Sequence, residues 1–124
     1  MKIYNMNLII YLLIFIIATS LIENNSYSVS LRFKNASKED FKSLHVKIFG
    51  KDYFFNELKR GKQTQAINVE KTYRYCYAEA ITSKDTIVFQ PVDYVGETLY
   101  KTGAITIELY IFPEEGKERI LRIR

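Results

Sequence analysis

The feature that most constrains this chain is a two-residue alternation of apolar and polar side chains. It is clearest in Ile105–Ile111 and recurs in Val29–Phe33 and Leu44–Ile48. A period of two places successive side chains on opposite faces of a strand, so each segment is predicted to be a half-buried strand. The predicted core residues are Val29, Leu31, Phe33, Leu44, Val46, Ile48, Ile105, Ile107, Leu109 and Ile111.

Weaker strand-like segments fill the rest of the chain. They are Tyr53–Phe55, Gln65–Val69, Tyr73–Ile81, Thr86–Gln90 and Arg119–Ile123. The turn-rich segments Ser83–Asp85 and Pro113–Lys117 are short enough to close antiparallel hairpins. No segment after residue 22 keeps a helical period over two turns. This spacing predicts an all-β fold, an antiparallel β-sandwich of about seven strands. A small closed β-barrel is the alternative.

The N-terminus has the pattern of an export signal. Met1 and Lys2 precede an unbroken apolar run at Leu8–Ile17, which is followed by the small residues of Ala18–Ser20. A basic start, a short apolar core and a small-residue exit are typical of a signal peptide. The run is shorter than the roughly 20 apolar residues of a membrane-spanning helix. We therefore predict a signal peptide at residues 1–20 and one domain at residues 21–124, located in the periplasm or outside the cell. An uncleaved membrane anchor through residues 8–22 is the alternative.

Composition excludes several classes of protein. The single cysteine, Cys76, cannot form an intramolecular disulfide or serve as a lipid-anchor site at the end of the signal. The net charge of +4 is spread along the chain, whereas nucleic-acid-binding proteins concentrate positive charge on one face. His45 is the only histidine, and it is predicted to face solvent. No motif for metal binding, cofactor binding or nucleophilic catalysis occurs, so we expect no enzyme, no metal, no cofactor and no nucleic-acid partner. Asn35–Ser37 matches the glycosylation sequon.

The segment Tyr73–Ile81 is the one candidate for a contact surface. As a strand it has one face made of three tyrosines and Glu79, and an opposite face of Arg74 and small residues. Burial of an unpaired glutamate costs several kcal/mol, so the tyrosine face is predicted to point outward. Exposed aromatic rows are typical of surfaces that bind proteins or carbohydrates. The predicted contact residues are Tyr73, Tyr75, Tyr77 and Glu79.

One short motif carries a family resemblance. Leu58–Gly61, followed by the strand-like Gln65–Val69, resembles the leucine-x-x-glycine corner of exported immunoglobulin-like bacterial domains. The chain after residue 20 is also similar to small uncharacterised exported β-proteins of Gram-negative bacteria. These resemblances imply an immunoglobulin-like sandwich in an exported protein, and they imply no function. The tryptophan and the second cysteine of true immunoglobulin domains are missing.

These observations favour a binding protein over an enzyme. The leading hypothesis is a non-catalytic exported binding or assembly module of the cell envelope. Its partner would be another envelope or secreted protein, bound through the tyrosine row or an exposed sheet edge. An inhibitor that presents a loop such as Asp93–Gly103 is a special case. The alternative is a carbohydrate-binding module that uses the tyrosine row. The membrane is a partner only if the N-terminal segment stays uncleaved.

Overall fold

The three strongly alternating segments form strands, as predicted. In a computed structural model that describes residues 9–11, 28–116 and 118–124, they are β1 (Val29–Asn35), β2 (Phe41–Ile48) and β7 (Gly103–Phe112). All ten predicted core residues are buried. The alternation decides this outcome because each strand has one face against the opposite sheet and one face toward solvent. The prediction of a signal peptide at residues 1–20 falls almost entirely outside the described residues. Among the residues that are described, no helix has the length and apolar character needed to cross a membrane.

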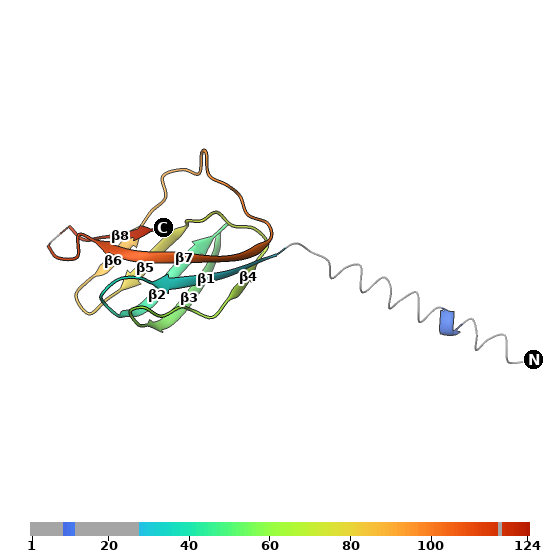
Figure 1. Cartoon of the computed structure of the whole chain (residues 1–124), viewed down its shortest axis with the longest axis horizontal. Coiled ribbons are helices and arrows are strands. Elements are labelled where there is room, and N and C mark those ends of the chain that lie inside the picture. The colour runs from blue at the N-terminus through green and yellow to red at the C-terminus, as the bar shows by residue number, and fades with distance from the viewer. Residues whose placement is uncertain (1–8, 12–27, 117) are drawn as a thin grey trace, which may run out of the picture.

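Five further strands complete two four-stranded sheets, which lie face to face (Figure 1). One sheet has the order β4-β1-β7-β8 and the other has the order β3-β2-β5-β6. The sandwich prediction is confirmed, and the two sheets do not close into a barrel. The additional strands are β3 (Lys51–Leu58), β4 (Ile67–Val69), β5 (Tyr77–Ile81), β6 (Thr86–Phe89) and β8 (Ile120–Ile123).

The strand pairing departs from the predicted pattern at one place. β1 and β7 run parallel, with Val29 opposite Gly103 and Asn35 opposite Leu109, so the first sheet is mixed. All other strand pairs are antiparallel. The parallel pair arises because β2 crosses to the other sheet, which leaves the two edges of β1 to strands from later in the chain. Immunoglobulin-like sandwiches share this architecture without always sharing the strand order.

Three pairs of consecutive strands are antiparallel neighbours in the sheets: β2–β3, β5–β6 and β7–β8. The predicted turns after β5 and β7 do connect antiparallel pairs, β5–β6 and β7–β8. The β2–β3 hairpin has a two-residue turn, Phe49 and Gly50, whose φ angles are 46° and 77°. Positive φ at both positions is typical of a type I′ turn, which matches the twist of the flanking strands. β3 begins directly after this turn, at Lys51.

The predicted strand Tyr73–Ile81 is shorter than expected. β5 begins only at Tyr77, because the chain before it pairs elsewhere. The Thr72 amide donates a hydrogen bond to the Tyr100 carbonyl at 2.9 Å, and the Tyr100 amide donates one to the Thr72 carbonyl at 2.8 Å. This bridge holds the segment before β5 next to the end of the long loop between β6 and β7. It therefore brings two stretches far apart in the sequence together at one end of the sandwich.

Candidate functional site

A column of four aromatic rings stands at this end of the sandwich. We call Phe49, Tyr73, Tyr94 and Tyr75 the aromatic stack. The ring centroids of Phe49 and Tyr73 are 5.7 Å apart, those of Tyr73 and Tyr94 are 4.5 Å apart, and those of Tyr94 and Tyr75 are 5.2 Å apart. All three interplanar angles are 20° or less. Stacked aromatic pairs contribute about 0.5–1.5 kcal/mol each beyond the area that they bury.

Three separate segments contribute to the aromatic stack. Phe49 comes from the β2–β3 turn, Tyr73 and Tyr75 come from the segment before β5, and Tyr94 comes from the β6–β7 loop. The Lys71 ammonium lies 4.8 Å from the centroid of the Phe49 ring, within cation–π range. The stack therefore ties a turn, an extended segment and a long loop to one another through side chains.

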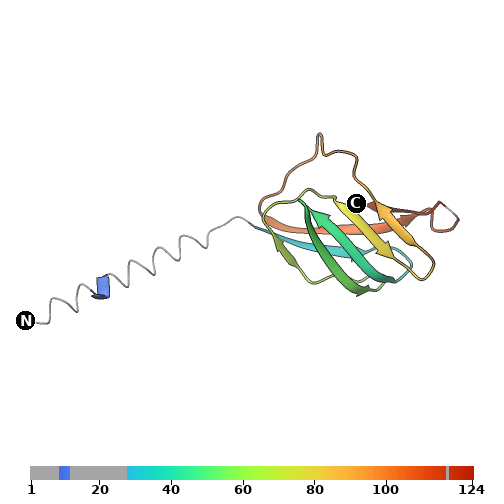
Figure 2. The same cartoon turned by 180° about the vertical axis from the view of Figure 1, so that it is seen from behind.

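The β6–β7 loop, which contains Tyr94 of the stack, projects from the sandwich (Figures 1 and 2). The Tyr75 hydroxyl donates a hydrogen bond to the Asp93 carbonyl at 2.7 Å. The Glu97 amide donates to the Tyr94 carbonyl at 3.1 Å, which closes a turn with Gly96 at φ 81°. This is the position at which a type II turn requires glycine. The loop is therefore anchored both by ring stacking and by hydrogen bonds.

The β6–β7 loop exposes two valines among polar residues. The side chains of Val92 and Val95 are 97% and 88% exposed. The Val95 amide donates a hydrogen bond to the Asp93 carboxylate at 3.1 Å, so the backbone beside this valine is held in place. Scattered exposed hydrophobic residues are normal, but two valines on one ordered, projecting loop form a surface suited to a partner.

A hollow of about 390 Å³ lies beside the aromatic stack. Its lining includes Tyr77, Gln90 and Lys47 in addition to rings of the stack. This volume falls within the range of small-molecule pockets, about 300–1,000 Å³. Cys76 also lines the hollow, but burial raises the pKa of its thiol to about 12. The thiol therefore stays protonated at physiological pH, which makes it unreactive as a nucleophile.

The tyrosines of the predicted row make two different sets of contacts. Tyr73, Tyr75, Tyr77 and Glu79 are all half-buried, and Cys76, Ala78 and Ala80 on the opposite face are buried, so the predicted alternation is observed. Tyr73 and Tyr75 belong to the aromatic stack. Tyr77 instead donates its hydroxyl to the Glu79 carboxylate at 3.0 Å on the outer face of the β5 sheet. Tyr77 nevertheless lines the same hollow as Tyr73 and Tyr75, so the three tyrosines meet at this hollow although only two of them belong to the aromatic stack.

The outer face of that sheet contains the only histidine. The His45 ring stacks on Phe54 with centroids 4.4 Å apart, and its Nε2 lies 2.7 Å from the Asp52 carboxylate. The predicted outward register of His45 is confirmed, although the ring is half-buried by these neighbours. Phe54 is 73% exposed, the most exposed aromatic ring of the sandwich. Within the described part of the chain, no three metal-binding side chains cluster.

The tyrosine hydroxyls near the site remain neutral at physiological pH. Partial burial, followed by the carboxylates of Glu97 and Asp93, raises the pKa of Tyr75 above its ordinary value. Burial and the hydrogen bond to Glu79 raise the pKa of Tyr77, and burial raises the pKa of Tyr94. Each hydroxyl can therefore donate a hydrogen bond, and none supplies a base for proton transfer near neutral pH.

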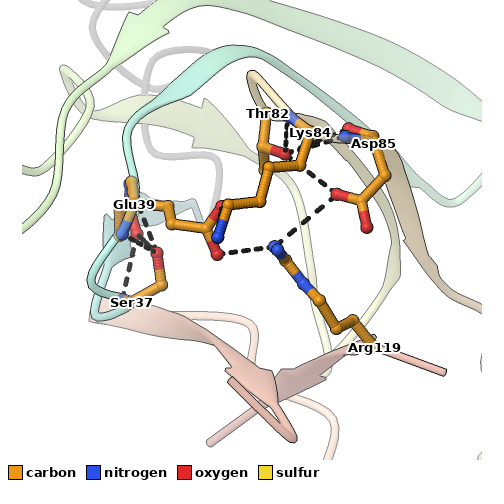
Figure 3. Close-up of polar contacts among 7 residues, drawn as sticks. Ser37, Glu39, Thr82, Lys84, Asp85 and Arg119 are labelled. Carbon is orange, nitrogen blue, oxygen red and sulfur yellow. Dashed lines mark hydrogen bonds and ion pairs between the residues drawn. The ribbon is translucent and has the colours of Figure 1, made fainter. Parts of the chain in front are cut away.

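The opposite end of the sandwich contains an ion cluster around a buried arginine (Figure 3). The Arg119 guanidinium, only 3% exposed, pairs with the Glu39 carboxylate and lies 3.6 Å from the Asp85 carboxylate. The Thr82 hydroxyl donates a hydrogen bond to Asp85 at 2.9 Å. The cluster joins the β1–β2 loop, the β5–β6 turn and the start of β8. Since both carboxylates are engaged with the arginine, the cluster has the character of a structural clamp.

The glycosylation sequon lies beside this clamp and is inaccessible. Asn35 is fully buried, and its side-chain amide donates hydrogen bonds to the carbonyls of Glu39 at 2.7 Å and Leu58 at 2.9 Å. The Ser37 hydroxyl donates a hydrogen bond to the side-chain amide oxygen of Asn35 at 2.6 Å. A glycan on this nitrogen would break both amide hydrogen bonds, so the folded domain cannot accept one there.

Sequence reasoning missed several members of the site. It did not identify Phe49, Tyr94, Val92 or Val95 as contact residues, although it considered the loop Asp93–Gly103 as an inhibitory loop. The sequence gives a weak indication for Phe49. A bulky residue directly before a turn glycine has no position in the core, so its ring is expected at the surface. Tyr94 carries none, since its stacking partners lie about twenty residues earlier in the chain.

Comparison with known proteins identifies the fold and no family. No family model matches the chain, and no curated protein matches it. A solved NMR structure of a protein from Eubacterium rectale is similar, with a TM-score of 0.56 and 10% sequence identity. The similarity covers 82% of this chain and 90% of that chain. At this identity the likeness shows the all-β fold alone.

Proposed function

We propose that this protein is a non-catalytic binding module of the cell envelope that contacts a protein partner. The contact surface is the β6–β7 loop together with the aromatic stack that supports it. The single observation that carries this proposal is the pair of nearly fully exposed valines, Val92 and Val95, on a loop fixed by stacked rings. A loop that is already ordered loses little conformational entropy on binding, so its apolar contacts contribute more fully to affinity.

The arrangement of the rings supports a protein partner over a carbohydrate. A platform for sugars needs free ring faces beside hydrogen-bonding side chains. Here Tyr73 lies between Phe49 and Tyr94, and Tyr94 lies between Tyr73 and Tyr75, so ring faces are occupied by other rings. The free edges, the two valines and the flanking carboxylates make a mixed apolar and polar surface of the kind that protein interfaces use. The carbohydrate-binding module remains the alternative proposal, since the adjacent hollow is lined by tyrosine, Gln90 and Lys47.

Export to the periplasm or the cell exterior is part of the same proposal. Its support is the apolar run Leu8–Ile17 with the small residues that follow it. The resemblance to small exported β-proteins of Gram-negative bacteria points to the same compartment. The proposed partner is therefore an envelope or secreted protein.

The test uses a double variant of the loop, Val92→Ser with Val95→Ser. Wild-type protein and variant are used as baits in the envelope fraction, and the affinity for each captured protein is then measured with purified components. Val88→Ser is the matched control, because Val88 is also exposed but lies on β6. Loss of two apolar interface anchors is expected to weaken binding by about tenfold or more, with the control unchanged.

Two results would reject a protein-binding loop. One is equal affinity of the double variant and the wild-type protein for every captured partner. The other is binding to an oligosaccharide array that is abolished by Tyr73→Ser and unaffected by the valine substitutions, which would establish the carbohydrate-binding alternative.

A further inference from the structure

The two sides of the sandwich differ in how their edge strands meet. On one side, β6 and β8 pack against each other across the two sheets. On the other side, β3 and β4 make almost no contact, and two hollows of about 410 Å³ and 240 Å³ lie between them. Both hollows are lined by β3 and by residues 63–71. We call this side the open seam. In Figure 2 it is the side on which β4 and the β3–β4 connection lie.

The walls of the open seam are apolar where they meet the core. Tyr53 and Phe55 from β3 and Ile67 from β4 are half-buried and pack against the core. The Phe55 ring lies 5.8 Å from the ring of the fully buried Phe33. Tyr53 and Phe55 are two positions apart, so both point to the inner face of their strand. An extended chain laid along β3 would present its own alternate side chains to this row.

The backbone of β3 has a free edge at which an extended chain can form hydrogen bonds. Within the part of the chain that the structure describes, β3 pairs with β2 alone, and every residue of β3 except Glu57, whose φ is 50°, has a partner there. Its other edge therefore presents backbone N–H and C=O groups that another strand can bind. We call the apolar groove over Tyr53, Phe55 and Ile67 the slot. In recognition by strand addition, a free strand edge supplies affinity through backbone hydrogen bonds, and an adjacent slot of this kind supplies side-chain specificity.

The charges around the open seam indicate the chemistry of the occupant. At one end lie Lys51 and Lys71, and at the other end lies the basic segment Lys59–Lys62, whose side chains are exposed. The seam's own acidic groups are Glu57 and Glu70, so cations exceed anions along it. A segment with acidic residues at both ends is complementary to this distribution.

We propose that the open seam binds an extended segment of a partner protein as an additional strand alongside β3. The segment has alternating apolar residues that enter the slot over Tyr53, Phe55 and Ile67, and acidic residues near both of its ends. One hollow of the seam reaches Phe49 of the aromatic stack, but the strand edge and the side chains that bind the segment lie apart from Val92 and Val95. The valine substitutions therefore test the proposed function separately from this site.

The test is a titration of the purified protein with a synthetic peptide, followed by amide chemical shifts and amide hydrogen exchange. The probe is as long as β3, alternates valine and threonine, and carries glutamates at both ends. The expected result is saturable shifts confined to residues 51–58 and 63–71, with slower exchange of β3 amides. The control probe has the same centre and lysines at both ends, and it is expected to bind more weakly.

Two protein variants make the result specific. Ile67→Lys places a charge inside the slot and is expected to weaken binding of the acidic probe about tenfold or more. Lys62→Glu removes an exposed positive charge, leaves the fold intact, and is expected to weaken binding about threefold. Lys101→Glu, an exposed lysine on the β6–β7 loop, is the matched control and is expected to change nothing.

Three results would overturn the proposal. The first is the absence of saturable shifts at the seam, and the second is a response confined to the β6–β7 loop. The third is a set of seam shifts that depends on protein concentration without any peptide, which would make a second copy of this chain the occupant.

Discussion

At the scale of single residues, Phe49 shows how a local cost serves the site. Its φ of 46° is uncommon for a bulky residue, and such conformations cost about 1–3 kcal/mol. The two-residue turn requires a positive φ at this position. The turn then directs the Phe49 ring onto the Tyr73 ring. The stacking with Tyr73 and the nearby Lys71 ammonium offset part of the cost. Backbone strain is thus located where the aromatic stack begins.

The register of β7 gives a prediction at the same scale. Leu109 is fully buried, whereas its neighbour Glu108 is half-buried and pairs with Arg124 at 2.9 Å on the outer face. Leu109→Ala is expected to lower the free energy of unfolding by about 2–5 kcal/mol, because it removes buried methyl groups and leaves a cavity. Glu108→Ala is expected to cost less than about 1 kcal/mol. Urea denaturation of both variants measures the difference, and equal losses would show that the register is wrong.

At the scale of elements, the clamp formed by Arg119, Glu39 and Asp85 holds together short connections that have little apolar surface to bury. It fixes the β1–β2 loop and the β5–β6 turn against the start of β8, at the end of the sandwich opposite the aromatic stack (Figure 3). Buried Asn35 adds hydrogen bonds to Glu39 and Leu58 nearby. Asn35 satisfies its buried side-chain amide in this way, whereas the clamp holds its guanidinium by ion pairing, with Arg119 Nε and Glu39 Oε1 buried and making no hydrogen bond to any residue that the structure describes. The aromatic stack has the corresponding role at the other end, but it also leaves apolar side chains exposed.

The clamp yields a prediction about stability. Arg119→Ala removes the main cation beside Glu39 and Asp85 and leaves the exposed Lys84 ammonium, 4.0 Å from Glu39. Because both carboxylates are partly exposed, the expected cost lies above that of an exposed pair and below the roughly 3–5 kcal/mol typical of a fully buried one. Arg124→Ala removes the exposed pair with Glu108 and is expected to cost less than about 1 kcal/mol. Thermal denaturation of both variants measures this contrast. A clamp that contributes nothing would give the two variants the same melting temperature.

At the scale of the whole molecule, the sequence predicts the sandwich better than the site. The alternation of apolar and polar residues identifies β1, β2 and β7 and their buried faces, because this pattern lies within the sequence of each strand. The pairing of β1 with β7 depends on which strands change sheets, and the alternation contains no information about that. The aromatic stack needs Phe49, Tyr73 and Tyr94 to meet from three segments, so only the folded chain brings them together. The open seam likewise depends on how two edge strands, β3 and β4, are placed in different sheets, which the sequence of neither strand indicates.

The first strand of the sandwich begins after the predicted cleavage site of the signal peptide. β1 begins at Val29, so cleavage after Ser20 would remove no residue of the sandwich. We expect the exported protein to begin at Leu21, because Ala18 and Ser20 supply the small side chains that signal peptidases accept. Intact mass of the protein from the periplasmic or secreted fraction measures this.

The control is the double variant Ala18→Leu with Ser20→Leu, which changes the exit of the signal and leaves the sandwich untouched. Larger side chains at these positions are expected to block cleavage, so this variant should stay full-length and remain with the membrane fraction. A wild-type species that still begins at Met1 and is found in that same fraction would contradict the prediction. It would also establish the alternative of an anchor through residues 8–22, with the β6–β7 loop and the open seam presented to partners near the membrane surface.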